Sequence, residues 1–188
     1  MRELSVFIGG VSGIGKSRLA TELARRHPWL TVVEFSELML PHLQEGLTRD
    51  RISCETTQYA RSRARFKALA DLSRVSRPNI VTGHYALCLF DDQGRLVGIE
   101  PSAPPALMDR VSAVILAKRE RRTPKLPIGV TVVDKHATRQ LQLSEDMEKA
   151  VHDFIEDTTS LPSLVVDLSL GNRAVEEAAL FIRGVFRE

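Results

Sequence analysis

The chain has 188 residues, 43% of them hydrophobic and 27% charged, with a formal net charge of +2. Its length suits one α/β domain with a full core and is too short for two of ordinary size. A net charge of +2 is too small to indicate a nucleic-acid-binding protein. No apolar run approaches the length of a membrane span. The first residues lead into a strand pattern without a signal segment, so we expect a cytoplasmic protein.

The first elements in the chain surround a glycine-rich loop. Residues 4–8 form an apolar run with β-branched residues that predicts a strand, and residues 18–26 have the apolar spacing of an amphipathic helix. The loop at residues 10–17 reads GVSGIGKS and matches the P-loop pattern, GxxxxGK followed by Ser or Thr, at every defined position. Because a P-loop requires this strand, loop and helix context, the sequence indicates a nucleotide-binding protein.

Phosphate binding explains each residue type in the loop. Glycines leave the backbone free to wrap phosphate oxygens, and the helix that follows offers unpaired amides and a positive dipole end. Lys16 is expected to reach the β- and γ-phosphates of ATP as a catalytic residue, and the Ser17 hydroxyl is expected to bind Mg²⁺. The predicted ATP-binding residues are Gly10, Ser12, Gly13, Ile14, Gly15, Lys16, Ser17, Arg18 and, after the last strand, Gly171.

Further along the chain, strand and helix patterns alternate. Strands are predicted at residues 31–35, 79–82, 112–117 and 164–168, and helices at residues 36–43, 55–75, 144–157 and 173–186. Residues 84–105 hold prolines and polar turns and predict a loop with one hairpin, whereas residues 129–133 are strand-like without a clear place in a sheet. The alternation predicts an α/β P-loop fold in three layers, with a mostly parallel sheet of about five strands covered by helices on both faces.

Positive charge is concentrated in two clusters, at residues 61–67 and 118–125. Most such clusters are solvated faces of a helix or a loop. The second cluster is broken by Pro124 and Pro127 and is a candidate for a mobile lid. We therefore expect one kinase domain over residues 1–188, with acceptor-binding inserts at about 36–75 and 84–105 and a lid at about 118–143.

The remaining motifs favour one class of P-loop protein. A GTPase needs an Asn-Lys-x-Asp segment after a later strand, and the sequence has none. Many ATPases carry an acidic residue at the end of an apolar strand to complete the magnesium site, but the strand at residues 79–82 is followed by Gly83 and His84. A small-molecule kinase, with its P-loop, acceptor site and Arg-rich lid in one short chain, fits better.

The order of elements resembles the archaeal-type adenylate kinase family, a branch of the nucleoside monophosphate kinases. The matching segments are the P-loop, residues 34–39, Arg49 with Asp50, and His84 followed by residues 94–98. Asp134, Arg139 and Ser144 have the spacing of the family's lid Asp, its second lid Arg and the Ser that begins the next helix. The sequence departs from the family at Gly83, where the family has an acid, and at Ala137, where it has the first lid Arg.

The resemblance implies phosphoryl transfer from ATP to a nucleoside monophosphate. An ionised phosphate acceptor needs no general base, so positioning and charge stabilisation supply the catalysis. The resemblance implies catalytic roles for Arg122 and Arg139, because the Arg side chain binds phosphate oxygens bidentately. The implied acceptor-binding residues are Glu34, Ser36, Glu37, Arg49, Asp50 and His84.

Two alternatives stay open. The first is a kinase for a hydroxyl group of a nucleoside or other small metabolite, which needs a base near the acceptor; Glu34, Glu37 and Asp50 are candidates. The second is a nucleotide-dependent ATPase switch or binding module, which the missing acid at Gly83 favours. The expected partners are a nucleotide phosphate donor and a small-molecule acceptor; neither a membrane nor a nucleic acid is expected, and the oligomeric state is left open.

Overall fold

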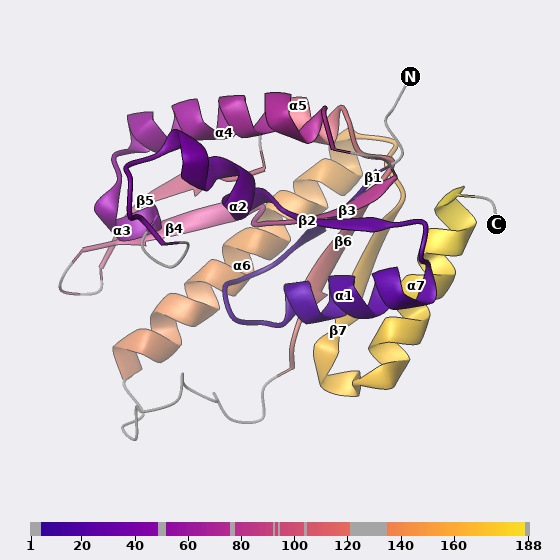
Figure 1. Cartoon of the computed structure of the whole chain (residues 1–188). Helices are drawn as coiled ribbons and strands as arrows, with labels where there is room; N and C mark the ends of the chain where they lie inside the picture. The colour runs from indigo at the N-terminus through magenta and orange to yellow at the C-terminus, as the bar shows by residue number, and fades with distance from the viewer. Residues whose placement is uncertain are drawn as a thin grey trace.

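A five-stranded parallel sheet forms the centre of the protein (Figure 1). The computed structural model describes residues 5–48, 52–75, 78–91, 93, 95–103, 105–120 and 135–186. The sheet has the strand order β2-β3-β1-β6-β7, with every neighbouring pair parallel. Its strands are β1 (Ser5–Gly9), β2 (Thr31–Glu34), β3 (Asn79–Thr82), β6 (Ala113–Lys118) and β7 (Ser163–Asp167).

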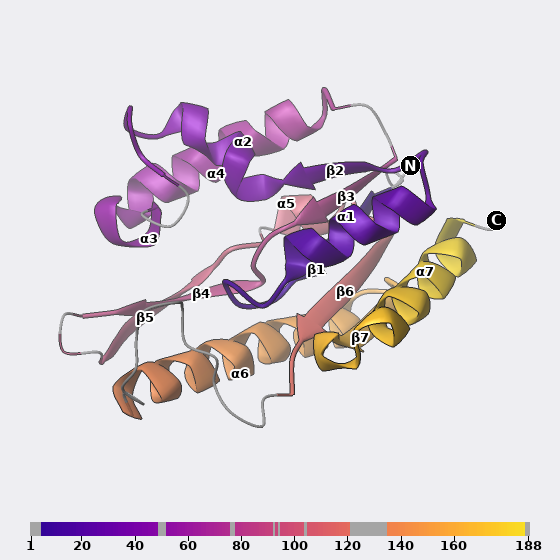
Figure 2. The same ribbon diagram turned by 60° about the horizontal axis from the view of Figure 1, so that its bottom comes forward.

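Helices cover both faces of the sheet. The helices α1 (Lys16–Arg26) and α7 (Asn172–Phe186) pack against each other on one face (Figures 1 and 2). The other face carries α4 (Gln58–Leu72), α5 (Pro105–Met108) and α6 (Lys135–Thr158). The predicted three-layer α/β fold with a parallel sheet of five strands is therefore confirmed.

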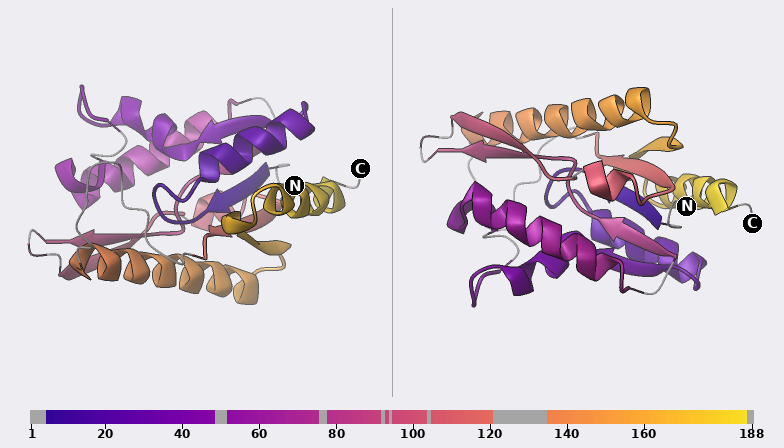
Figure 3. Two further views of the ribbon diagram at one scale, coloured as in Figure 1. Left: turned by 90° about the horizontal axis from the view of Figure 1, so that it is seen from below. Right: turned by 90° about the horizontal axis from the view of Figure 1, so that it is seen from above.

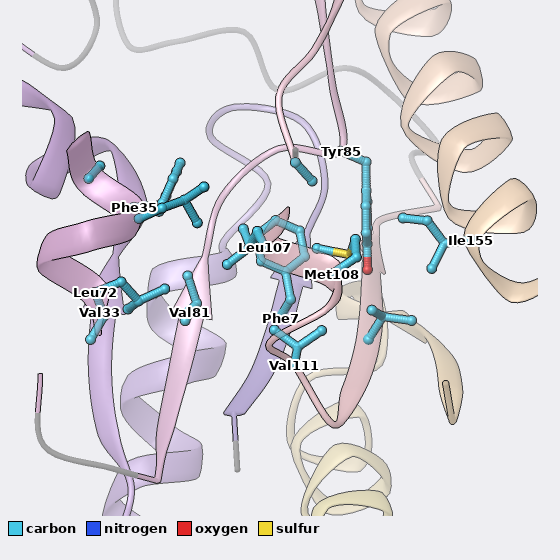
Figure 4. Close-up of a cluster of buried hydrophobic side chains, with 14 of the residues drawn as sticks. Phe7, Val33, Phe35, Leu72, Val81, Tyr85, Leu107, Met108, Val111 and Ile155 are labelled. Carbon is cyan, nitrogen blue, oxygen red and sulfur yellow. The ribbon is translucent and has the colours of Figure 1, made fainter. Parts of the chain in front are cut away.

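Strand β1 separates two hydrophobic clusters because its side chains alternate between the faces of the sheet. Val6 and Ile8 pack in the cluster beneath α1 and α7, whereas Phe7 packs in the cluster on the opposite face. Figure 4 shows Phe7 beside Leu107 and Met108, with Tyr85 on the same side of the sheet. All five residues of β1 are buried, as expected for a strand in the middle of a parallel sheet.

The predicted hairpin lies within residues 84–105. Strands β4 (Ala86–Phe90) and β5 (Leu96–Pro101) form an antiparallel pair outside the main sheet. Both views of Figure 3 show this hairpin alongside α6, and β4 contacts that helix. The hairpin extends the domain beyond the carboxyl ends of the parallel strands.

Several helix boundaries differ from the sequence-based prediction. Residues 36–43 form α2 (Phe35–Met39) followed by the 3₁₀ helix η1 (Leu40–His42). The predicted helix at residues 55–75 is interrupted near its start. Helix α3 (Ile52–Glu55) ends there, and α4 begins at Gln58. The Thr57 side chain caps α4 by accepting a hydrogen bond from the Ala60 amide.

The prediction that a helix begins at Ser144 was wrong. Helix α6 begins nine residues earlier, at Lys135, and the Ser144 hydroxyl donates to the Gln140 carbonyl within the helix. Residues 135–143, assigned to the lid from sequence, are therefore the first part of α6. The strand-like residues 129–133 lie outside the described residues. Among the helices that the structure describes, none is both long and apolar enough to span a membrane.

Gly9→Ala is expected to destabilise the protein, because the added Cβ would lie 2.2 Å from the ring of the fully buried Tyr85. Overpacking of a core costs about 1–3 kcal/mol, which urea-induced unfolding measures. Gly184→Ala is the control: Gly184 lies in α7, its added Cβ would meet no described residue within 4 Å, and alanine favours a helix by about 0.5–1 kcal/mol. Equal effects of the two substitutions would contradict the packing around Tyr85.

Candidate active site

The P-loop follows β1 at the carboxyl edge of the sheet and leads into α1 (Figure 2). Gly10 has φ +144°, and a Cβ atom there would lie 2.4 Å from the Ala117 carbonyl oxygen. The loop therefore needs glycine at this position, both for the backbone conformation and for the close approach to β6. Gly15 caps α1 with φ +112°, and the amides of the first turn face the loop as an anion-binding N-terminus.

Lys16 folds back over the loop. Its ammonium group donates hydrogen bonds to the carbonyl oxygens of Gly10 and Val11, at 2.5 and 2.8 Å. A bound phosphate would offer stronger acceptors in the same region, because a charge-assisted hydrogen bond to an anion exceeds one to a carbonyl. Arg119 also reaches this loop, since one of its guanidinium nitrogens lies 3.8 Å from the position that a Cβ of Gly15 would take.

A cavity of about 660 Å³ opens beside the P-loop. Ser12, Gly13, Gly15, Lys16 and Ser17 line it on the phosphate side. Its other walls come from the ends of β2 and β3, from α4 and the hairpin, and from α6. This volume accommodates a small ligand next to a nucleotide phosphate.

Three of the predicted acceptor residues line this cavity. Glu34 and Ser36 lie at the end of β2 and the start of α2, and His84 lies two residues after β3. Glu37 is exposed and is not among the described residues that line the cavity. Arg49 and Asp50 lie outside the described residues.

The predicted lid arginines have no described position at the cavity. Arg122 lies outside the described residues. Arg139 is exposed on α6 and is not among the described residues of the cavity wall, although its neighbour Leu141 is.

A second cavity, of about 410 Å³, lies between the P-loop and α6. Ile14 lines it together with Gly10, and residues 118–120, at the end of β6 and directly after it, form another wall. Arg18 and Gly171 are both exposed and are not among the described residues that line either cavity. The predicted ATP-binding residues thus divide between two cavities and the surface beside them.

Two arginines on α4 and a glutamate on β5 form a buried ionic cluster at the wall of the larger cavity. Arg61 donates to Glu100 through Nε at 2.9 Å and through Nη2 at 2.7 Å, and Arg65 donates to the other oxygen of the same carboxylate. All three residues are at most 7% exposed. Burial raises the pKa of Glu100, but the hydrogen bonds and positive charges of the two arginines outweigh this effect and hold it below its ordinary value.

In this cluster two guanidinium groups share one carboxylate beside the cavity. Both arginines line the cavity, and the Arg65 Nε atom is buried without a hydrogen-bond partner among the described residues. An unpaired buried donor is costly.

His84 is held by a buried carboxylate from α6. Its Nδ1 atom lies 2.7 Å from Oε1 of Glu148, and Oε2 of the same carboxylate accepts a hydrogen bond from the Tyr85 amide at 2.6 Å. Glu148 is 2% exposed, whereas the His84 side chain is 29% exposed and lines the larger cavity. The carboxylate therefore orients an imidazole that lines the cavity.

Gly83 stands where many ATPases have an acidic residue, and the surrounding core accounts for the glycine. A Cβ atom there would lie 3.0 Å from the Phe7 ring. A side chain at this position would require the ring to move within the hydrophobic cluster.

The sequence-based prediction missed Arg61, Arg65, Glu100 and Glu148. The arginines were treated as part of a charged cluster, although Ala64, Ala68 and Leu72 mark the same face of α4 as its buried face. Glu148 likewise shares the buried face of α6 with Ile155. A charge within an apolar helical stripe was the available signal for both sites.

The sequence matches no protein-family model and no curated relative. Solved structures with a similar fold include shikimate kinase from Bacteroides thetaiotaomicron, with 13% identity, a TM-score of 0.56, and coverage of 98% of this chain and 99% of that one. Shikimate kinase from Aquifex aeolicus has 18% identity and a TM-score of 0.55, with coverage of 96% and 97%. Gluconokinase from Sinorhizobium meliloti has 14% identity and a TM-score of 0.50, with coverage of 98% and 95%.

These structures show that the chain has the fold of P-loop kinases. They support the resemblance to P-loop kinases in general. They do not single out the archaeal-type adenylate kinases that the sequence motifs resemble.

Glu100→Gln is expected to lower the free energy of unfolding by about 3–5 kcal/mol at neutral pH, because two buried guanidinium groups lose their counter-charge. The pKa of Glu100 is lowered in the folded protein, so its stabilisation is present above the ordinary value of 4.5 and is lost as the pH falls through the lowered value. Urea unfolding at several pH values should show the two proteins converging in acid.

Asp91→Asn provides a control for this prediction. Asp91 pairs with Arg95 at the surface, so its substitution should change stability far less. A difference between wild type and Glu100→Gln that stayed constant down to about pH 3 would contradict the ionic role of Glu100.

Proposed function

We propose that this protein is an ATP- and Mg²⁺-dependent kinase that phosphorylates a hydroxyl group of a small metabolite. The observation that carries the proposal is the larger cavity, in which Lys16 and Ser17 of the P-loop share a wall with Glu34 and His84. A kinase must hold a phosphate donor and an acceptor within reach of each other. One cavity with a phosphate-binding end and a polar end meets that requirement.

The P-loop residues suit the donor. Its amides and the Lys16 ammonium would bind the β- and γ-phosphates of ATP, and the open space beside Gly13 leaves room for them. The Ser17 hydroxyl lines the same cavity and is the hard oxygen donor that Mg²⁺ prefers. Bound there, Mg²⁺ would neutralise charge on the transferring phosphoryl group.

The opposite wall suits a small acceptor with a negatively charged group. Arg61 and Arg65 line this wall, and a guanidinium group binds an anionic oxygen through charge-assisted hydrogen bonds. Two of the structurally similar proteins are by name kinases of shikimate and gluconate, which are hydroxylated carboxylic acids. Their names agree with an acceptor of this kind and size.

Phosphoryl transfer to a nucleoside monophosphate remains the competing function. It rests on the sequence resemblance and on Arg49 and Arg122, which lie outside the described residues. Arg139 is exposed, and its position does not support this competing function. The cavity wall with a carboxylate and an imidazole favours a hydroxyl acceptor instead, since a hydroxyl must lose a proton and an ionised phosphate need not.

The test is incubation of purified protein with ATP and Mg²⁺ against a panel of acceptors, with the products identified by ³¹P NMR. The panel contains hydroxy acids such as shikimate and gluconate, sugars, nucleosides, nucleoside monophosphates and a sample without acceptor. A new phosphate monoester from a hydroxyl compound is the expected product. Formation of a nucleoside diphosphate alone would overturn the proposal in favour of the monophosphate kinase, and ATP hydrolysis without transfer would favour the ATPase switch.

Lys16→Ala is expected to lower kcat by at least about 10²–10³-fold, because the Lys16 ammonium would stabilise the charge on the transferring phosphoryl group. Steady-state kinetics with the best acceptor of the panel measure this loss. Lys67→Ala, which removes an exposed lysine of α4, is the control and should retain activity. Full turnover by Lys16→Ala would contradict the P-loop assignment.

A further inference from the structure

We infer that His84, oriented by Glu148, is the general base that takes the proton from the acceptor hydroxyl. This inference rests on the proposed function, since only a hydroxyl acceptor requires a base. It differs from the sequence-based expectation, in which a carboxylate served as the base and His84 only bound the acceptor.

The sheet order puts His84 between the donor and the acceptor sides of the cavity. Strand β3 lies between β1, which leads into the P-loop, and β2, which ends at Glu34. Thr82 is paired with Ile8 on one side and with Glu34 on the other, and the Gly83 amide donates to the Ile8 carbonyl at 3.0 Å. His84 therefore leaves the sheet at the strand between the P-loop strand and the strand that ends at Glu34, where an acceptor hydroxyl must meet the γ-phosphate.

The hydrogen bond to Glu148 determines which imidazole nitrogen can act as a base. A buried carboxylate accepts a proton donor, so Nδ1 of His84 carries hydrogen and donates to Oε1. In the neutral imidazole this leaves Nε2 as the acceptor. The described residues provide no hydrogen bond to Nε2, and the side chain lines the cavity. Glu148 is then a positioning residue that also stabilises the imidazolium formed by proton transfer.

The neighbouring residue, Tyr85, anchors this arrangement. Its amide donates to Glu148, its hydroxyl donates to the Ile115 carbonyl at 3.1 Å, and its carbonyl accepts from the Ser102 amide at 3.0 Å. Its ring is fully buried and lies edge to face with Phe7, at 5.0 Å between centroids. Burial and the charge of Glu148 raise the pKa of Tyr85 well above its ordinary value, so the hydroxyl remains a donor. His84 is thus held at a fixed position before any ligand binds.

The acceptor oxygen attacks the γ-phosphorus of ATP, the bond from that phosphorus to the β,γ-bridging oxygen breaks, and ADP leaves with the electron pair. The proton of the hydroxyl moves to Nε2 of His84, and the imidazolium donates through Nδ1 to Glu148. The proton passes to solvent when the products leave, since the side chain is partly exposed.

Other charged and titratable groups face the same cavity from each surrounding element. They are Lys16 of α1, Glu34 of β2, Arg61 and Arg65 of α4, Cys88 of β4 and Glu148 of α6. Burial raises the pKa of the Cys88 thiol, so this group stays neutral near pH 7. Glu34 is the competing base, and the test includes its variant.

The test measures kcat/KM against pH for wild type, His84→Asn, Glu148→Gln and Glu34→Gln, with the hydroxyl acceptor that the wild type phosphorylates fastest in the panel. For the wild type, the rate should fall about tenfold per pH unit below the range in which histidine titrates. His84→Asn should lower the rate by about 10²–10⁴-fold and remove this acid limb. Glu148→Gln should cause a smaller loss, because the imidazole loses the hydrogen bond that orients it.

A second readout does not depend on activity. In protein labelled with ¹⁵N-histidine, NMR should show His84 with its proton on Nδ1, and Glu148→Gln should change this tautomer while urea unfolding shows that the variant is folded. His42→Asn is the matched control, because His42 also pairs with a carboxylate, Asp71, at 2.5 Å but is not among the described residues of the cavity. It should leave the rate and the pH profile unchanged.

The outcomes separate this inference from the proposed function. If the wild type phosphorylates no hydroxyl acceptor, the proposed function is overturned and the base with it. If the wild type phosphorylates a hydroxyl acceptor, two results would overturn the inference alone. In the first, His84→Asn keeps both the rate and the acid limb of the pH profile. In the second, the acid limb is lost only in Glu34→Gln. A rate that instead falls as the pH rises through the histidine range would show that His84 binds as a cation, which also overturns it.

Discussion

Parallel pairing of β1 with β3 on one side and β6 on the other is the constraint on which the rest of the structure depends. Parallel strands bring their carboxyl ends to one edge, so the segments that follow these three strands emerge next to one another. Because both faces of β1 are buried, a slip of one residue would turn Phe7 into the wrong hydrophobic cluster. The hydrophobic core thereby sets the position of the P-loop relative to His84.

Charged groups are buried at the wall of the larger cavity, where apolar residues would have no desolvation cost. Moving an ion out of water costs several kcal/mol even after relaxation, and pairing repays that cost only when the geometry is good. Arg61, Arg65 and Glu100 share such a geometry, and Glu148 satisfies two donors from adjacent residues. Groups held in this way need no rearrangement when charge develops on a ligand, which is the condition for electrostatic catalysis.

Tyr85 joins the core to the candidate catalytic groups. Its ring fills the space against Gly9 at the end of β1, and on another side it packs against the buried His152 of α6. Its amide meanwhile shares the Glu148 carboxylate with His84. Packing between the sheet and α6 therefore also positions the imidazole, and a loss of stability at this point would be expected to disturb the site.

The sequence by itself determined the P-loop, the parallel sheet of five strands and the hairpin, because periodicity and motif spacing are properties of contiguous residues. It failed at the start of α6, because Ser144 has the residue type of a helix cap but lies inside the helix, which begins at Lys135. Only the tertiary structure decided that Arg61 meets Glu100, 39 residues away, and that Glu148 meets His84, 64 residues away. The physical reason is that a buried charge is stable only beside its partner, and local pattern carries no information about which distant segment supplies that partner.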